Sequence, residues 1–386
     1  MSRAAKATAT ESLMGRIVAR ASKDSGDNLR RLGDTPLHAV DVVSTGSLNL
    51  DLAMGVGGFP RGRIGEVYGA EAVGKTTLIL KHIVEMQKHG LGVAFIDAEH
   101  ALDVKYAQSL GVDTDDLYVA QPMCGEEALE LVINLCESAT AELAALETAA
   151  EATAKATKQP KKPIDSTGAL GLIVVDSVAA LVPKVELEGE MTDQQMGVQA
   201  RMMGKAMRKL TALAATANVT VIFINQTREK IGGYGGKTTS GGNALKFFAS
   251  FRVSLTNIGQ IKDTSDAKIG NRVKATVVKN KVAAPFIEVE YDVIAGEGID
   301  RAGEVIDVAK EHGIMAARGA WLSYADKNVA NGRPATKVAL RANPDLMAEI
   351  EGKVRESARV HGIKGPPKVK GKKPVDDAEG EDGVAL

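Results

Sequence analysis

The stretch IGEVYGAEAVGKT, residues 64–76, decides the fold. It begins with an apolar run at 64–68 that is typical of a buried strand, and it ends in GAEAVGKT, which has the phosphate-binding pattern GxxxxGK[ST]. A helical pattern follows, from about residue 76 to 89. A strand, a glycine-rich loop and a helix in this order predict a P-loop, where backbone N–H groups and the positive end of the helix face phosphate oxygens.

The P-loop assigns a set of residues to a bound nucleotide. Lys75 can reach the β- and γ-phosphates of ATP, and the Thr76 hydroxyl can bind the Mg²⁺ that bridges them. A glycine-rich turn with an accidental lysine is the alternative, and the strand–loop–helix context argues against it. We expect the following residues to surround the phosphates: Gly69, Ala70, Glu71, Ala72, Val73, Gly74, Lys75, Thr76 and Thr77.

Three polar residues follow apolar runs farther along the chain, at the edge where a parallel sheet binds its ligands. Asp176 ends the run LIVVD and can hold the hydration shell of Mg²⁺, so Thr76 and Asp176 form the predicted metal site. Glu99 can orient or deprotonate the attacking water, and Gln226 can contact the γ-phosphate. Each also has a plainer interpretation, as a group that caps a turn or lies in solvent. The P-loop upstream favours the metal role for Asp176, while both interpretations stay open for Glu99 and Gln226.

Short apolar runs alternate with helical patterns from about residue 62 to 296, which is typical of an α/β fold with a doubly wound sheet. The runs from 93 to 225 are mostly non-alternating, as in strands buried on both faces. The last runs follow one another closely and are interpreted as antiparallel additions. We therefore predict a P-loop NTPase core with a mainly parallel central sheet and helices at about 76–89 and 194–217. The predicted strands are Ile64–Tyr68, Val93–Asp97, Leu117–Ala120, Leu172–Asp176, Val219–Asn225, Phe251–Leu255, Val273–Val278 and Ile287–Val293.

Changes in pattern and composition divide the chain. Residues 1–40 contain a short amphipathic helix that cannot bury its own apolar face, which predicts an oligomerisation segment. The core at 41–299 is interrupted at 139–169 by an insertion rich in Ala, Thr, Glu and Lys, interpreted as an extended helix followed by a linker. Residues 300–361 form a small α+β unit. The tail at 362–386 is basic and then acidic, with little to bury, and should be disordered.

Composition limits the class of protein. Of 386 residues, 44% are hydrophobic and 25% charged, which is ordinary for a globular protein. The net charge is −1, so a nucleic-acid-binding face must be local. Cys124 and Cys136 lack metal-site or disulfide spacing. No stretch approaches the roughly 18 apolar residues that a membrane span needs. We expect a cytoplasmic protein with no membrane partner.

Many segments in one order resemble the bacterial RecA recombinases, over about residues 41–361. The resemblance implies a RecA-type ATPase core with a small helical N-terminal segment and a small C-terminal domain. It also implies an ATP-dependent DNA strand-exchange enzyme that forms a homo-oligomeric helical filament on single-stranded DNA and pairs it with homologous duplex DNA. The matching segments are STGSLNLDLAMGVGGFPRGRIGEVYG, FIDAEHALD, VVDSVAALVPKVELEGE, MGVQARMM, FINQTREKIGG, GGNALKFFAS and VVKNKVAAPF, together with the P-loop.

The resemblance implies catalytic roles at matching positions. Lys75 contacts the phosphates, Glu99 corresponds to the carboxylate that activates water, and Gln226 corresponds to the γ-phosphate sensor. Asp176 corresponds to the acidic residue that holds Mg²⁺ through water.

Further positions match family residues that contact ATP from outside the P-loop. Asp103 and Tyr106 match residues that lie against the adenine. Lys279 and Lys281 match basic residues that reach the ATP of the adjacent subunit. Phe247 matches a residue that relays between the ATP site and a neighbouring subunit, although core packing is an equally good interpretation.

Two segments, at 188–201 and 227–243, match the family's DNA-binding loops. The second is rich in glycine, so its ordering on ATP and DNA can act as a switch. A surface loop without a role is the alternative. This loop, which contains Tyr234, is about two residues shorter than is usual in the family. The predicted DNA-binding residues are Met196, Gly197, Arg201, Arg228, Lys230, Tyr234, Lys237, Gly241, Gly242 and Asn243.

Two other functions remain compatible with the residues. One is a hexameric DNA helicase or motor on the same fold. The other is a DNA-binding mediator that hydrolyses ATP poorly, which the combination of Lys75, Thr76, Glu99, Asp176 and Gln226 argues against. The insertion and the basic part of the tail depart from the family pattern and indicate a divergent member, such as one encoded by a phage.

Overall fold

The computed structural model describes residues 13–14, 16–18, 20, 40–157, 168–190, 197–229, 237–263 and 265–362, without the side chains of 228, 229 and 237. The chain divides into two compact units, Met1–Asp41 and Val42–Leu386. All described residues from 13 to 20 in the first unit are helical, as the amphipathic pattern predicts. The predicted tail lies outside the described residues except for Gly362.

The second unit is built on a mainly parallel sheet, which confirms the predicted fold class. Six strands pair in parallel in the order β9-β3-β7-β6-β4-β5. Their carboxyl ends therefore meet at one edge of the sheet. The six strands are β3 (Ile64–Gly69), β4 (Gly92–Asp97), β5 (Leu117–Ala120), β6 (Leu170–Asp176), β7 (Thr220–Glu229) and β9 (Phe251–Lys262).

Antiparallel strands extend the sheet at one side. β10 (Lys268–Asn280), β11 (Ile287–Ile294) and β12 (Gly298–Ile299) follow β9 in that order. β8 (Lys237–Thr239) pairs antiparallel with the end of β7.

The prediction that all the last runs are antiparallel is wrong for the first of them. β9 begins at Phe251, pairs antiparallel with β10 and pairs in parallel with β3, where Gly65 lies opposite Phe251. The residues between β7 and β9 include the short helix α9 (Ala244–Phe248), and such a connection is long enough to return the chain to the start of the sheet. Sequence runs alone do not show this crossover.

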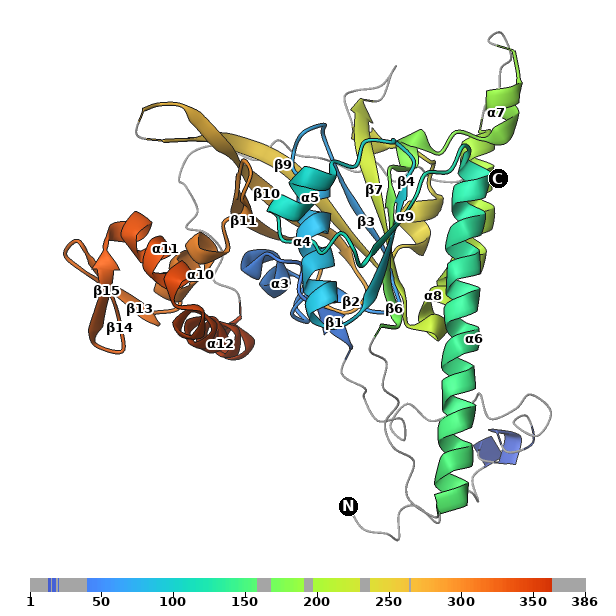
Figure 1. The fold of residues 1–386 in the computed structure, drawn as a ribbon, viewed down its shortest axis with the longest axis horizontal. Coiled ribbons are helices and arrows are strands. Elements are labelled where there is room, and N and C mark those ends of the chain that lie inside the picture. Colours follow the sequence, from blue (N-terminus) through green and yellow to red (C-terminus); the bar gives the residue numbers. More distant parts are fainter. Residues whose placement is uncertain are drawn as a thin grey trace. The chain divides into compact units, whose positions relative to one another are not determined.

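Helices cover both faces of the sheet (Figure 1). α4 (Lys75–Lys88) packs on one face, in an apolar core that includes Leu78, Ile79 and Ile83. α6 (Gly125–Thr157) and α8 (Val198–Ala217) pack on the other, in a core with Val132, Met207 and Leu210. The shorter elements are β1 (Val42–Val43), β2 (Phe59–Pro60), α3 (Leu48–Ala53), α5 (Val104–Ser109), the 3₁₀ turn η2 (Val178–Ala180) and α7 (Lys184–Glu188).

The first part of the predicted insertion continues α6 as one uninterrupted helix, which Figure 1 shows running past the sheet. Its buried side chains end at Cys136, and beyond Leu146 almost every side chain is exposed. Leu143 and Leu146 line an apolar groove of about 590 Å³ against β4 and β5. Residues 158–167 lie outside the described ranges. Despite its length α6 is too polar to cross a membrane, and no other helix in the described ranges qualifies.

Residues after 300 form the expected small α+β unit, in which three helices surround a three-stranded antiparallel sheet in the order β13-β14-β15. Val305, Ile306, Leu340, Ile350 and Val354 fill its core. The elements are α10 (Arg301–Glu311), β13 (Met315–Arg318), β14 (Trp321–Tyr324), β15 (Lys327–Asn331), α11 (Gly332–Ala342) and α12 (Pro344–His361).

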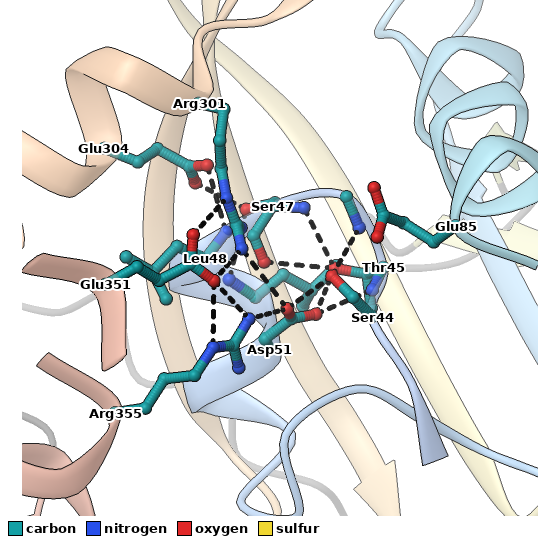
Figure 2. Close-up of polar contacts among 12 residues, drawn as sticks. Ser44, Thr45, Ser47, Leu48, Asp51, Glu85, Arg301, Glu304, Glu351 and Arg355 are labelled. Atoms are coloured by element: carbon teal, nitrogen blue, oxygen red, sulfur yellow. Dashed lines mark hydrogen bonds and ion pairs between the residues drawn. The ribbon is translucent and has the colours of Figure 1, made fainter. Parts of the chain in front are cut away.

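A buried polar cluster joins this unit to the core (Figure 2). The Glu304 carboxylate of α10 accepts hydrogen bonds from the Ser47 hydroxyl at 2.5 Å and the Leu48 N–H at 3.0 Å, at the start of α3. Asp51 of α3 pairs with Arg355 of α12 at 2.7 Å and accepts from the Thr45 N–H and hydroxyl. These bonds satisfy the buried carboxylates. They also explain why the segment STGSLNLD, residues 44–51, contains several polar residues although much of it is buried.

Removing the exposed end of α6 should leave the fold intact. Leu146 and Gly168 line the same groove, so a short Gly/Ser linker can replace residues 147–167. Because nearly all the side chains of 147–157, the described part of this segment, are exposed, the free energy of unfolding should change by less than about 1 kcal/mol, a shift of a few degrees in the unfolding midpoint. Calorimetry and DNA-dependent ATPase assays measure both properties. An unfolded product would place this segment in the core.

Candidate functional site

The P-loop joins the end of β3 to α4. Gly74 precedes the helix with φ of 95°, a left-handed conformation that favours glycine. A Cβ at Gly69 would lie 2.5 Å from the Leu255 carbonyl oxygen of β9, so only glycine fits there. The Lys75 ammonium donates to the carbonyl oxygens of Gly69 at 3.3 Å and Ala70 at 2.8 Å. The loop therefore holds the lysine amine directly beside the predicted phosphate site.

Thr76 and Asp176 meet across the sheet edge. The Thr76 hydroxyl donates to Asp176 Oδ2 at 3.0 Å, although the residues are 100 positions apart. Burial first, and then the nearby charge of Glu99, raise the pKa of Asp176 to about 6, against the opposing effects of the Thr76 hydrogen bond and the charge of Lys75. Burial also lowers the pKa of Lys75, against the attraction of Asp176 and Glu99. The hydroxyl and carboxylate oxygens are the donor types that Mg²⁺ prefers.

Glu99 and Gln226, predicted from separate runs, lie together. The Gln226 side-chain amide donates to Glu99 Oε1 at 3.2 Å, and the Ser177 hydroxyl donates to the same oxygen. Glu99 is exposed and Gln226 is partly buried. Sequence reasoning missed Ser177, whose position directly after Asp176 was the available signal. The carboxyl ends of β4, β6 and β7 thus bring the predicted catalytic groups to one place.

Asp97 shapes the turn that carries Glu99, and sequence reasoning missed this residue too. Its carboxylate is buried and accepts from the N–H groups of Ala101 at 3.1 Å and Leu102 at 3.2 Å. The side-chain amide of Gln121 also donates to it at 3.0 Å. These bonds fix the turn after β4 and therefore the direction of Glu99.

A pocket of about 440 Å³ lies between the P-loop and the ends of β10 and β11. Tyr106 lines it and shares a hydrogen bond of 2.8 Å between its hydroxyl and that of Thr77. Asp103 caps α5 by accepting from the Tyr106 N–H at 3.0 Å, which fixes the start of the helix that carries Tyr106. The opposite wall, 268–271 and 293–295, was not predicted, because it comes from strands about 160–190 residues after Tyr106.

Lys279 and Lys281 lie away from this chain's own P-loop. Lys279 on β10 is opposite Arg252 of β9, and its ammonium donates to the carbonyl oxygens of Lys246 at 2.6 Å and Phe247 at 2.9 Å, at the end of α9. Lys281 is exposed. Phe247, for which core packing was the alternative, is 72% exposed.

The two predicted DNA segments converge where the structure describes them. Gly241 packs beside Val178 of η2, and Gly242 packs beside Ala200 of α8, the helix that begins after Gly197. The Gln199 side chain donates to the Val178 carbonyl at 2.9 Å and so holds α8 on η2. The end of the second segment and the start of α8, which lies within the first segment, therefore rest on the chain that continues from Asp176.

Part of the second predicted loop is a strand pair. Thr227 lies opposite Thr239, and the backbone of Arg228 lies opposite Thr238. Arg201 and Asn243 are exposed. Met196, Lys230 and Tyr234 lie outside the described residues, as do the side chains of Arg228 and Lys237.

Comparison with known sequences matches nearly the whole chain. The model of the RecA N-terminal domain matches residues 13–161 and 159–300, and that of the RecA C-terminal domain matches residues 303–359. The chain belongs to the RecA family. Family membership makes it a recombinase and a DNA-dependent ATPase. The two N-terminal matches meet just beyond the described end of α6.

Bacterial relatives match over similar lengths. The chain is 50% identical to Protein RecA of Campylobacter jejuni subsp. doylei over 336 residues, which are 86% of this chain and 89% of that protein. It is 48% identical to Protein RecA of Cereibacter sphaeroides over 361 residues, 93% and 95% of the two chains. Identity to Protein RecA of Helicobacter pylori strain P12 is 51% over 332 residues, 85% and 87%.

Asp176→Asn should stabilise the nucleotide-free protein at neutral pH. Because the pKa of Asp176 is raised to about 6, the folded state favours its protonated form. Its contribution to stability is therefore present below about pH 4 and is lost as the pH rises through about 6. Asparagine cannot ionise, so the variant should be more stable by about 1–3 kcal/mol at pH 7 and equal at about pH 4. Denaturant unfolding at both pH values measures this difference, and a less stable variant at pH 7 would contradict the assignment.

Proposed function

We propose that the chain assembles in the cytoplasm as a helical filament on single-stranded DNA and exchanges that strand with a homologous duplex at the expense of ATP. The observation that carries the proposal is the meeting of Lys75, Thr76, Asp176, Glu99 and Gln226 at one sheet edge. These residues lie at or just beyond the ends of β3, β4 and β6, and within β7, which continues to Glu229. The same edge continues through η2 into the predicted DNA segments.

ATP would bind with its phosphates on the P-loop and its base in the pocket beside Tyr106. The backbone N–H groups at the start of α4 and the Lys75 ammonium complement the phosphate charge. Asp103 and Tyr106 would lie against the adenine, with Ile269–Asn271 and Val293–Ala295 as the opposite wall. The pocket is large enough to hold a nucleoside.

Mg²⁺ would neutralise charge on the β- and γ-phosphates. Thr76 would bind it directly and Asp176 would bind it through water, because these two oxygens already lie 3.0 Å apart. Their hydroxyl and carboxylate chemistry fits a hard cation. A bound cation would also favour the ionised form of Asp176, against the burial that raises its pKa.

Glu99 would orient and deprotonate the water that attacks the γ-phosphate. The Ser177 hydroxyl and the Gln226 amide both donate to Glu99 Oε1, so the carboxylate is aimed before the nucleotide binds. Gln226 would exchange this bond for a bond to the γ-phosphate. Its position then reports whether a triphosphate is present.

DNA would lie against the segments at 188–201 and 227–243, through phosphate contacts that do not depend on base sequence. Gly197, Arg201, Gly241, Gly242 and Asn243 are the described residues of this face, and Met196, Arg228, Lys230, Tyr234 and Lys237 would complete it.

Lys279 and Lys281 would reach ATP bound to the next subunit of the filament. Both lie away from this chain's own P-loop, at a face that also exposes Phe247. A closed ring would also place subunits head to tail, as in a hexameric helicase or motor. The family match favours the open filament.

The test is ATP hydrolysis with and without single-stranded DNA, together with negative-stain images of the same samples. We expect DNA to stimulate hydrolysis and the images to show filaments. Lys75→Ala is the control, and it should lower turnover at least about 100-fold because it removes a charge that stabilises the transition state. Closed rings would favour the motor, and near-normal turnover by Lys75→Ala would overturn the P-loop assignment.

Glu99→Gln should separate binding from hydrolysis. The amide has the shape of the carboxylate but cannot accept a proton, so turnover should fall about 100-fold or more. Affinity for ATP and for single-stranded DNA should stay within a few-fold of the parent. Fluorescent-nucleotide titration and DNA anisotropy measure the two affinities. Loss of ATP binding would mean that Glu99 holds the nucleotide and does not activate water.

A further inference from the structure

A buried ion pair crosses the middle of the sheet, away from the catalytic groups. Glu66 of β3 is 0% exposed, and its Oε2 accepts from the Arg252 Nε of β9 at 2.5 Å. Arg252 is 9% exposed, and its guanidinium lies 4.7 Å from the centre of the Tyr68 ring. A buried pair of this kind contributes little net stability compared with apolar residues of the same volume, because both charges lose their hydration. Its presence therefore calls for a role besides stability.

The second oxygen of Glu66 holds Asn225 of β7. The Asn225 amide nitrogen is fully buried and donates to Glu66 Oε1 at 2.8 Å and to the Ser240 carbonyl oxygen at 3.0 Å. Its amide oxygen accepts from the Gln226 N–H at 2.8 Å. Every hydrogen of the Asn225 amide is used, so the side chain has one orientation.

These three bonds connect three parts of the molecule. Gln226 is the residue whose side chain bonds Glu99 at the nucleotide site. Ser240 directly follows β8 and precedes Gly241, which packs on η2. Glu66 is anchored in the sheet, two strands from β10. Asn225 is therefore a fixed junction between the proposed γ-phosphate sensor and the return strand of the proposed DNA segment.

We infer that Asn225, oriented by the Glu66–Arg252 pair, is a positioning residue that couples the nucleotide state to DNA binding. The inference rests on the proposed function. If Gln226 moves toward a γ-phosphate, its N–H moves with the Asn225 oxygen. The amide nitrogen then shifts relative to the Ser240 carbonyl, because Glu66 holds it from the other side. Movement at the nucleotide thus changes the backbone at the end of β8, which carries Gly241 and Gly242 toward the DNA face.

Arg252 extends the junction toward the neighbouring-subunit face. Lys279 lies opposite Arg252 in the sheet, and its pKa is lowered by burial first and then by the charges of Lys281 and Arg252, while Glu66 opposes the change. Lys279 in turn holds the carbonyl end of α9, which begins just after Gly242. The start of the segment from β8 to α9 is thus bonded to this junction through Asn225, and its end is held by a residue that neighbours Arg252 in the sheet.

The test exchanges the donor and the acceptor in the double variant Glu66→Gln/Asn225→Asp. The new glutamine oxygen can accept from Arg252 and its amide nitrogen can donate to the new carboxylate at position 225, so the link between β3 and β7 remains and the net charge of the cluster is unchanged. The new carboxylate can still accept from the Gln226 N–H. It cannot donate to the Ser240 carbonyl, so the bond to the return strand is lost and replaced by repulsion between two oxygens, while the other bonds of the junction keep their partners.

The measurement is the dissociation constant of a labelled single strand with ADP and with a non-hydrolysable triphosphate analogue. The ratio of the two constants is the coupling factor. Coupling factors between sites are usually about 5 to 150. In the double variant Glu66→Gln/Asn225→Asp, called the swap variant, the coupling factor should fall toward one, to roughly a tenth of the parental value. KM for ATP without DNA should stay unchanged, and so should the unfolding midpoint within a few degrees. A parental coupling factor in the folded swap variant overturns the inference.

Two further variants keep the result interpretable. Asn225→Ala removes the junction and leaves the Glu66–Arg252 pair intact. It takes the place of the swap variant if the swap variant does not fold. A parental coupling factor in Asn225→Ala would likewise overturn the inference. Ser47→Ala is the matched control, because it removes a buried hydrogen bond to Glu304 far from this junction. It should lower stability and leave the coupling factor unchanged; a factor lowered as much as in the swap variant overturns the inference. A parent chain with a coupling factor of one would refute the proposed function itself.

Discussion

The register between parallel strands is the constraint on which the rest of the structure depends. β3 and β7 pair so that Gly69 lies opposite Gln226, and β4 and β6 pair so that Asp97 lies opposite Asp176. The start of the P-loop, the proposed sensor and the proposed metal ligand therefore end at the same level of the sheet. A shift by one residue would turn each of these side chains to the opposite face. Apolar side chains on both faces of the sheet hold this register, in the two cores beneath α4 and beneath α6 and α8.

Buried charges occur at two levels of this sheet and have different consequences. At the edge, burial raises the pKa of Asp176 and lowers the pKa of Lys75, so it destabilises the ionised form of each residue. The predicted phosphate site is therefore formed by groups whose charges are incompletely solvated. In the interior, Glu66 is neutralised by Arg252 and bonded by Asn225, so every polar atom of the Glu66 carboxylate has a partner. The first arrangement is suited to binding a charged ligand. The second is suited to holding backbone segments in a single geometry.

The cluster around Glu304 and Asp51 shows the same principle in a purely structural setting. It fastens the small C-terminal unit to the start of α3, far from the P-loop. Burial raises the pKa of Glu304 to about 7, while the bonds from Ser47 and Leu48 favour its ionised form.

The sequence by itself determined the P-loop, the strand ends that carry Asp176, Glu99 and Gln226, and the family. These features are local, because each depends on residue types within a few positions of one another. Only the tertiary structure decided that β9 joins the sheet in parallel. It alone brought Ser177 to Glu99, 78 positions away, and Asn225 to Glu66, 159 positions away. Such contacts depend on the crossover of the chain and on strand register, which side-chain patterns along one strand do not encode.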